Sequence, residues 1–377
     1  MSQRRVGVAD IVVGEPLKWN AYGTDGKLLL RKGYIIESER QVAGLLERGL
    51  YIDASSANDA RKDPIKKVDT PSVVRLLNTA NKRLERLLFG ISGESDAQTK
   101  VIELVKDIAD ATDINRNIAL ACIHLNQSSG SYSTRHSINT AIVSMLVMRA
   151  MHKSQEEIVN VMAAALTMNI GMLRHHDHFS SKSEPLTEKE WDIIKKHPSV
   201  GIELLKQAGV NNEAWLSHVL QHHENTDCTG YPLGTNAQTL SQNSRILSFA
   251  DQYCASVSIR KYRKTLPHAA ALRDVFLKGP LASDKMLAAY FIKELGPYPP
   301  GAFVLLKDGE IGVVTGNGAA PATPIVHALI GPRGAPLSLP IKRDTAKLSH
   351  GIRDYVSMED IPSCFSLHQL WGEQAIL

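Results

Sequence analysis

The chain has 377 residues, of which 43% are apolar and 22% are charged, and its formal net charge is +4 at pH 7. This composition is typical of a globular protein with a sizeable core, and the length is enough for two or three domains. The excess positive charge is small and scattered, without a basic stripe interleaved with aromatic residues, so we expect no nucleic-acid partner.

The sequence predicts a cytoplasmic protein without a membrane span. Its most apolar segments, near residues 142–148 and 161–168, are soon interrupted by polar residues, whereas a membrane-spanning helix needs about 20 consecutive apolar residues. We therefore expect both segments to be core helices. No long apolar stretch follows the N-terminal arginines, so no signal peptide is expected. The four cysteines lie far apart, which predicts reduced thiols.

Residues 1–53 are expected to form a small N-terminal unit of mixed α and β structure. Residues 17–22 and 27–36 flank Asp25-Gly26, a dipeptide typical of a β-hairpin with a type I′ turn, in which both central residues have positive φ. A short helix and a return strand are expected to follow this hairpin.

A helical domain is expected over residues 72–296, after a polar and charged linker over residues 54–71. From Val73 onward, apolar residues recur at helical spacing. The first helix of this pattern could pack on its own domain or pair two copies of the chain as a homodimer. The first role is the more common one for an apolar stripe.

Residues 297–377 are expected to form a small C-terminal β module, either barrel-like or an open sheet. Asp308-Gly309 gives a second hairpin signal inside it. Candidate strands lie at residues 303–307, 310–314, 325–330 and 337–341.

Five residues with metal-ligand side chains are spread through the helical region: His136, His197, His222, His223 and Asp251. Each alone has an ordinary interpretation, because a helix histidine is more often a core or surface residue than a ligand, and a buried aspartate is often structural. Adjacent histidines point about 100° apart on a helix. His222 and His223 would therefore share one ion only if the helix ends there, and the polar loop that follows predicts such an end.

In this order and with these neighbours, the five residues resemble the HD-GYP family, a branch of the HD metal-dependent phosphohydrolases. The resemblance covers about residues 130–265, and its most specific part is Gly230-Tyr231-Pro232, which follows the adjacent histidines. It implies a mainly α fold, an HD-type helical bundle. Members of the family hydrolyse cyclic di-GMP, a dianionic bacterial second messenger, with two or three metal ions, often iron or manganese.

The resemblance also implies roles for individual residues. The five residues named above become metal ligands, and the Gly-Tyr-Pro loop lies at the substrate side. Arg260 and Arg263 are expected to contact phosphate. The implied partners are cyclic di-GMP itself and a diguanylate cyclase-type protein that contacts the Gly-Tyr-Pro region.

The chain departs from the family pattern at its central position. Met168 and Asn169 stand where the family carries its His-Asp pair, Met172 replaces a lysine, and Tyr132 stands where trinuclear members carry a glutamate. A neutral amide cannot bridge two cations as a carboxylate does, and a thioether binds hard or borderline metals poorly. We expect no catalytic residue at positions 168 and 169, and either one iron or manganese ion at the remaining ligands or none.

Three functions follow from this pattern. The first is a nucleotide- or partner-binding regulatory module with little or no hydrolysis. The second is an active phosphodiesterase with an altered metal site, which the five retained ligand-type residues favour. The third is a helical domain whose histidines are satisfied core residues.

A displaced His-Asp pair must also be considered, because the sequence 175–178 reads His-His-Asp-His. It lies beyond the apolar helix and is followed by a polar stretch. We therefore expect it to form an exposed loop rather than a metal site.

Overall fold

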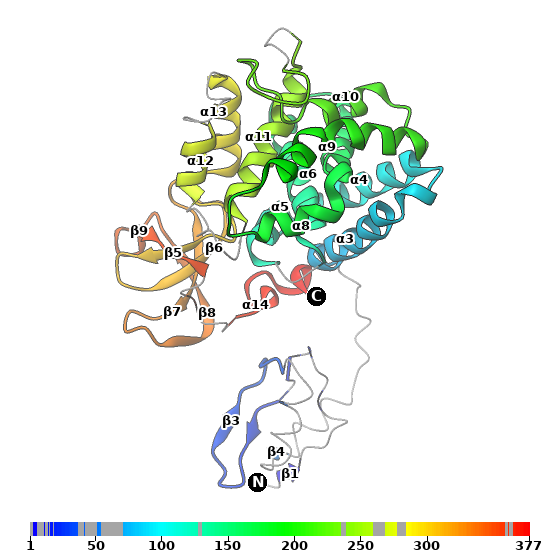
Figure 1. Ribbon diagram of the computed structural model, residues 1–377. Helices are drawn as coiled ribbons and strands as arrows, with labels where there is room; N and C mark the ends of the chain where they lie inside the picture. Colours follow the sequence, from blue (N-terminus) through cyan, green and yellow to red (C-terminus); the bar gives the residue numbers. More distant parts are fainter. Residues whose placement is uncertain are drawn as a thin grey trace. The chain divides into compact units, whose positions relative to one another are not determined.

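The computed structural model divides the chain into two compact units, Met1–Asp69 and Thr70–Leu377 (Figure 1), and each is described by itself. The structure describes residues 3–5, 11, 14, 16–17, 19–36, 41, 51–53, 71–126, 130–234, 239–258, 268–276, 284–358, 361 and 365–377.

The first unit contains a four-stranded antiparallel sheet in the order β1-β4-β2-β3. Its strands are β1 (Gln3–Arg5), β2 (Ala21–Tyr22), β3 (Leu28–Leu30) and β4 (Tyr51–Asp53). Strands β2 and β3 form the expected hairpin, and β4 is the expected return strand. The helix expected between β3 and β4 falls largely on residues outside the described ranges.

The hairpin turn differs from the predicted type I′ turn. Gly26 has a φ of +73°, but Asp25 is not among the residues with positive φ. The Asp25 side chain accepts a hydrogen bond from the Lys27 backbone N–H at 3.1 Å, and Gly23 N–H donates to the Lys27 carbonyl at 2.8 Å. Such a local side-chain bond favours an ordinary φ at the aspartate. The prediction of a hairpin is confirmed, and its turn type is wrong.

The second unit is mainly helical. Its helices are α3 (Val73–Phe89), α4 (Ala97–Ile114), α5 (Arg116–Leu125), α6 (Tyr132–Ala150), α7 (Gln155–Thr167), α8 (Leu173–Ser181), α9 (Glu188–Gln207), α10 (Glu213–Gln221), α11 (Gln242–Val257), α12 (His268–Phe276), α13 (Lys285–Leu295) and α14 (Leu367–Trp371). Short 3-10 turns are η2 (Ile91–Gly93), η3 (Ile170–Met172), η4 (Leu348–His350) and η6 (Gly372–Ala375). Capping boxes open α7 and α9.

Helix α3 has the amphipathic pattern that begins at Val73. Its apolar face is buried, with Val73 and Leu84 fully enclosed, and it packs against α4 and α5 of the same unit. That face is therefore part of the bundle's own core and is not available to pair two copies of the chain.

Helix α6 lies at the centre of the bundle (Figure 1), and every residue from His136 to Met148 is buried. Its apolar stretch is thus the core helix that the sequence predicted. Among the described residues, none of the helices has the length and apolar character that a membrane crossing requires. The described cysteines, Cys122, Cys228 and Cys254, are free thiols.

The C-terminal β module is an open five-stranded antiparallel sheet in the order β8-β7-β6-β5-β9. Its strands are β5 (Phe303–Leu306), β6 (Ile311–Gly316), β7 (Ile325–Ile330), β8 (Pro336–Asp344) and β9 (Ile352–Tyr355). The predicted hairpin joins β5 to β6 through Gly309, whose φ is +89°. Over the described part of the module β8 and β9 lie at opposite edges, so the sheet does not close into a barrel.

Helix α13 is held by an ion pair near each end. Arg245 of α11 pairs with Asp284, the N-cap of α13, at 2.6 Å. Arg116 of α5 pairs with Glu294 in the last turn of α13 at 2.7 Å. Helix α5 in turn contacts β6 of the C-terminal sheet. The two pairs therefore connect α11 to the sheet through α13 and α5.

The turn after α7 approaches α9 closely at Gly171. A Cβ atom at this position would collide with the backbone carbonyl of His197 and with the backbone of Gly201. Only glycine allows this approach, so residues 168–172 are held directly against the segment of α9 that carries His197.

Replacing Gly171 with alanine is expected to lower the free energy of unfolding by about 1–3 kcal/mol, because the methyl group forces backbone apart. Urea denaturation measures the loss. Gly93→Ala is the matched control, since no atom lies within 4 Å of a Cβ placed there. Equal denaturation midpoints for the two variants would show that the approach at Gly171 is not tight.

Candidate metal centre

The expected metal ligands come from separate helices of the second unit. His136 lies in α6, His197 in α9 and Asp251 in α11. Helix α10 ends at Gln221, and His222 is its C-cap residue. The predicted helix end is therefore confirmed, and both adjacent histidines lie where the chain leaves the helix.

Three of these histidines form one compact cluster. Ligand nitrogens of His197, His222 and His223 all lie within 4.8 Å of one another, and the Nε2 atoms of His197 and His222 are 3.2 Å apart. The ring centroid of His223 is 5.2 Å from that of His197 and 4.0 Å from that of His222. His197 precedes the adjacent pair His222 and His223 by 25 positions in the sequence, and the fold brings the three together.

Hydrogen bonds fix the protons of two of the rings. His197 Nδ1 lies 2.6 Å from the Ile194 carbonyl, and His222 Nδ1 lies 2.7 Å from the Val219 carbonyl. Because a carbonyl oxygen only accepts, each Nδ1 carries the proton, and each Nε2 presents a lone pair. Two lone pairs that face each other are satisfied by a cation between the rings, and carbonyl-oriented imidazoles are typical of metal ligands. The residues present therefore fit a metal ion.

Burial favours the neutral form of all three rings. It lowers the pKa of His197, of His222 and of His223, the last to about 3. For His197 and His223, the positive charge of neighbouring histidines lowers the pKa further. Since only a deprotonated nitrogen binds a metal, the cluster is held in its ligand form at neutral pH.

His136 and Asp251 form a second pair beside the cluster. His136 Nε2 lies 2.7 Å from Asp251 Oδ1, and both residues are buried. Although burial opposes ionisation, the hydrogen bond from His136 holds the pKa of Asp251 below its ordinary value. The Asp251 charge raises the pKa of His222 and His223 against the effect of burial, so the carboxylate acts directly on the cluster.

The segment with the displaced His-Asp pair is not a loop. It forms helix α8, and His176 is buried at 8% exposure, whereas His175 and His178 are exposed. Asp177 accepts backbone hydrogen bonds from Tyr132 at 3.3 Å and from Ser133 at 2.8 Å. This carboxylate at the N-terminus of α6 fastens α8 to α6, which the local sequence pattern could not indicate.

His176 therefore lies beside the expected ligand His136, whereas the sequence pattern predicted that residues 175–178 would form an exposed loop. Its ring meets that of His136 edge-on, with centroids 5.8 Å apart. It also meets the ring of Tyr132 at 5.5 Å, and Tyr132 stacks on His136 at 5.6 Å.

Met168 and Asn169 are both buried, at 0% and 4% exposure. They lie in the turn between α7 and η3 that packs against α9 at His197. These positions thus adjoin the cluster and carry no carboxylate.

The loop after His223 is anchored by a buried carboxylate. Glu224 has no exposed surface, and its Oε1 accepts backbone hydrogen bonds from Leu233 at 2.6 Å and Gly234 at 3.2 Å. A Cβ at Gly230 would collide with the backbone of residues 223–225. The sequence pattern did not indicate this anchoring role of Glu224.

The anchored loop brings Tyr231 onto the cluster. Its ring centroid lies 4.7 Å from that of His223 and 6.4 Å from that of His197, and Pro232 follows through a cis peptide bond. Arg260 and Arg263, the expected phosphate contacts, lie outside the described residues.

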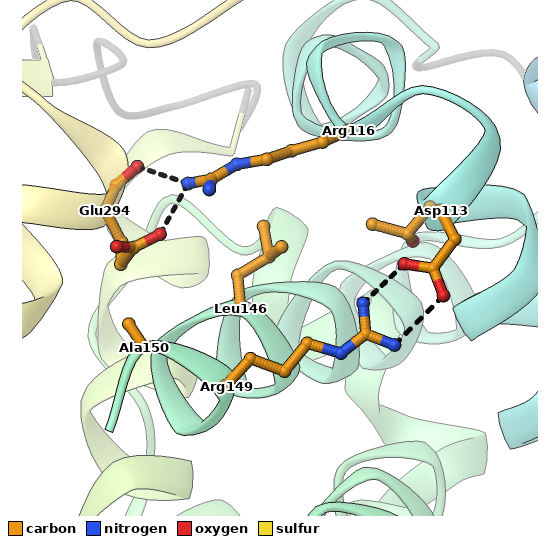
Figure 2. A pocket seen from close by; sticks show the side chains of 7 residues that line it. Asp113, Arg116, Leu146, Arg149, Ala150 and Glu294 are labelled. Carbon is orange, nitrogen blue, oxygen red and sulfur yellow. Dashed lines mark hydrogen bonds and ion pairs between the residues drawn. The ribbon is translucent and has the colours of Figure 1, made fainter. Parts of the chain in front are cut away.

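A separate cavity of about 340 Å³ lies at the other end of α6. Figure 2 shows Arg149 paired with Asp113 and Arg116 paired with Glu294. The Arg149 Nη1 and Asp113 Oδ1 atoms are 2.5 Å apart. Its Ala150 follows His136 by fourteen positions in α6, a rise of roughly 21 Å. Because both arginines are already paired with carboxylates, this cavity offers no free charge to an anionic ligand.

The helical bundle and its clustered histidines define an HD-type domain. Residues 99–276 match the HD domain family, and this part of the chain is an HD domain. A solved HDG"Y"P protein from Bdellovibrio bacteriovorus shares the fold, with a TM-score of 0.50 at 15% identity over 77% of this chain and 98% of that chain.

Two sequence relatives carry a stated activity. A cyclic di-GMP phosphodiesterase of Borreliella burgdorferi, PdeB, is 29% identical over 203 residues, which are 54% of this chain and 53% of that protein. A cyclic di-GMP phosphodiesterase of Pseudomonas aeruginosa is 25% identical over 309 residues, 75% of this chain and 74% of that protein. The chain thus spans about half the length of the first relative and about three quarters of the second.

Replacing His222 with glutamine is expected to weaken metal binding at the cluster by about 10-fold to 100-fold or more, because it removes one of three convergent imidazoles. Titration calorimetry of metal-free protein measures the affinity. His218→Gln is the control, since His218 is also a buried histidine of α10 but bonds to Ser244 outside the cluster. Equal metal affinities in the two variants would contradict a metal site here.

The metal-free protein is expected to lose stability as the pH falls below about 6.5, the ordinary pKa of histidine in an unfolded chain. Below that value the unfolded state takes up a proton, whereas in the folded state the desolvated ring of His223, with a pKa of about 3, stays neutral. The loss reaches about 1.4 kcal/mol per pH unit for this residue and continues down to its folded pKa. Urea denaturation between pH 7 and 4 measures it.

His223→Gln should flatten this pH dependence, whereas His175→Gln, a change at an exposed position, should not. Parallel profiles for the native chain and His223→Gln would show that His223 is not kept neutral by burial.

Proposed function

We propose that the chain is a regulatory module of cyclic di-GMP signalling, which binds the dinucleotide at its histidine cluster and hydrolyses it little or not at all. The observation that carries the proposal is the absence of a carboxylate at Asn169 in a site whose other ligands converge. The stated activity of the two relatives supports the choice of nucleotide.

Charge decides what such a site can bind. The three clustered imidazoles are neutral and Asp251 is negative, so a dianion is attracted only when a cation is present. One iron or manganese ion at His197, His222 and His223 would supply that charge, and Arg260 and Arg263 would add to it. Nucleotide binding should therefore depend on the metal.

Hydrolysis requires more metal ions at the site than nucleotide binding does. Two-metal phosphodiester cleavage needs cations about 3.5–4 Å apart that stabilise both the attacking and the leaving oxygen. A carboxylate that binds both ions offsets their mutual repulsion. Asn169 supplies an amide oxygen without charge, and Met168 supplies a thioether, so a closely spaced pair of ions loses its main support.

An active phosphodiesterase with an altered site is the second candidate. The facing Nε2 atoms of His197 and His222, and the pair of His136 with Asp251, favour it, because both arrangements keep ligand atoms ready. In this case the reaction would proceed with fewer or differently held ions.

A diguanylate cyclase-type protein is the partner that we propose for the loop around Gly230. Leu233 follows Pro232 and is 58% exposed, while its backbone is fixed by Glu224. A rigidly held, exposed apolar side chain suits a protein contact.

The decisive experiment combines binding with product analysis. Titration calorimetry with cyclic di-GMP is expected to give saturable binding in the presence of Mn²⁺ and none after chelation, and chromatography is expected to find no linear dinucleotide. Metal-dependent formation of the linear dinucleotide would establish the second candidate, and absence of binding with metal present would contradict both.

Restoring the family pair is expected to create hydrolysis. The double variant Met168→His with Asn169→Asp regains a bridging carboxylate and an imidazole, and it should release the linear dinucleotide in a metal-dependent reaction. Asn160→Asp is the control, because Asn160 is a buried asparagine of the preceding helix that bonds to Asn212. If hydrolysis appears in neither variant, the missing pair does not explain a lack of activity.

A further inference from the structure

Helix α9 carries a proline in its interior, directly after the expected ligand His197. Pro198 is buried and lies well inside the helix, which runs from Glu188 to Gln207. A proline in such a position lacks the backbone N–H that would bond to the carbonyl four residues earlier, and its ring crowds that carbonyl. It therefore destabilises a helix more than any other residue does. A feature that costs stability and lies at a candidate site points to a role there.

The missing N–H leaves one carbonyl of α9 without its helical donor. In an α-helix the N–H of each residue bonds to the carbonyl four residues earlier, so the group that Pro198 leaves free is the carbonyl of Ile194. That oxygen lies 2.6 Å from His197 Nδ1. The imidazole of His197 thus donates to the carbonyl that the next residue in the chain leaves without a donor.

The facing ring, that of His222, has the same kind of partner for a different reason. His222 Nδ1 lies 2.7 Å from the carbonyl of Val219, again three residues earlier. The helical donor to that carbonyl would be the N–H of residue 223, but α10 ends at Gln221. The last carbonyls of a helix have no partner within it. The end of the helix therefore frees a carbonyl for His222, as the proline does for His197.

These free carbonyls decide which nitrogen of each ring faces the other. An ordinary residue at position 198 would bring an N–H that competes with the imidazole for the Ile194 carbonyl. A ring without a firm acceptor at Nδ1 also populates the tautomer that carries its proton on Nε2. That proton would occupy the lone pair of His197 that faces His222 Nε2 at 3.2 Å.

We propose that Pro198 is a positioning residue of the metal centre. Because it has no N–H, it leaves the Ile194 carbonyl to the Nδ1 proton of His197. Nε2 of that ring is then the atom that faces the rest of the cluster and binds the cation, since the second partner of a metal-bound imidazole fixes its tautomer and its orientation. The proposal rests on the metal centre of the proposed function and is independent of nucleotide binding and of hydrolysis.

Replacing Pro198 with alanine is expected to separate metal affinity from stability. Alanine restores the helical N–H and removes the crowding ring, so the urea denaturation midpoint of the metal-free protein should hold or rise. The affinity for Zn²⁺, measured by titration calorimetry, should fall by about 10-fold to 100-fold, the usual effect of disturbing the partner of a metal-bound histidine. Ser199→Ala, at the next position of α9, keeps the proline and should bind Zn²⁺ as the native chain does. Equal affinities of Pro198→Ala and the native chain would overturn the proposal.

A backbone ester separates the missing N–H from the shape of the proline ring. Incorporating lactic acid at position 198 gives a chain with neither the ring nor the N–H, so the Ile194 carbonyl stays free. The ester is expected to bind Zn²⁺ with the native affinity. If it loses affinity as Pro198→Ala does, Pro198 acts through the shape of the helix, and the proposal is wrong.

The proton on His197 gives a readout that needs no metal. Nitrogen-15 NMR of the imidazole rings in the metal-free protein distinguishes a proton on Nδ1 from one on Nε2. The native chain is expected to carry it on Nδ1 of His197, and Pro198→Ala is expected to show both tautomers there, while His222 keeps its Nδ1 proton in both chains. An unchanged His197 tautomer in Pro198→Ala would contradict the proposal. A chain that shows these tautomers but binds no cation would contradict the proposed function alone.

Discussion

The Nε2 atoms of His197 and His222 face each other at 3.2 Å, while the protons of both rings are held on the far side by backbone carbonyls. Neither ring can turn to relieve this contact without leaving a buried N–H unsatisfied, which costs about 1–3 kcal/mol. Much of the surrounding structure maintains the arrangement. The close approach at Gly171 fixes the position of α9. His222 is the C-cap residue of α10, and its ring faces that of His197.

Charge is the property in which this centre differs most from a carboxylate-rich one. Its described ligand side chains are mainly neutral imidazoles, with Asp251 as the carboxylate that acts on them. Such a set attracts cations less strongly than a set of carboxylates does, because its imidazole ligands are neutral. Imidazole nitrogens are softer donors than carboxylate oxygens, so the site prefers the ions that imidazole favours. The same shortage of negative charge weakens any closely spaced ion pair, which is why binding without turnover is the function we favour.

Most of the fold was predictable because its signals are local. The two hairpins and the end of α10 each depend on a few adjacent residues, and these predictions agree with the structure. The burial of His176 depends on Asp177 meeting the start of α6, a contact 44 residues away in the chain. The turn type at Asp25 depends on a side-chain bond that competes with the backbone preference. The open edge of the C-terminal sheet depends on how far strands curve, which strand patterns do not encode.

The paired arginines around α13 give the molecule a mechanical connection. Arg245 extends from the helix that carries Asp251, and Arg116 extends from the helix that contacts the sheet. Arg245 pairs with the N-cap residue of α13 and Arg116 pairs with a residue in its last turn, so α13 connects the two helices that carry these arginines. Through these pairs, the β module and the helix that carries the carboxylate beside the histidines are joined by one continuous series of contacts.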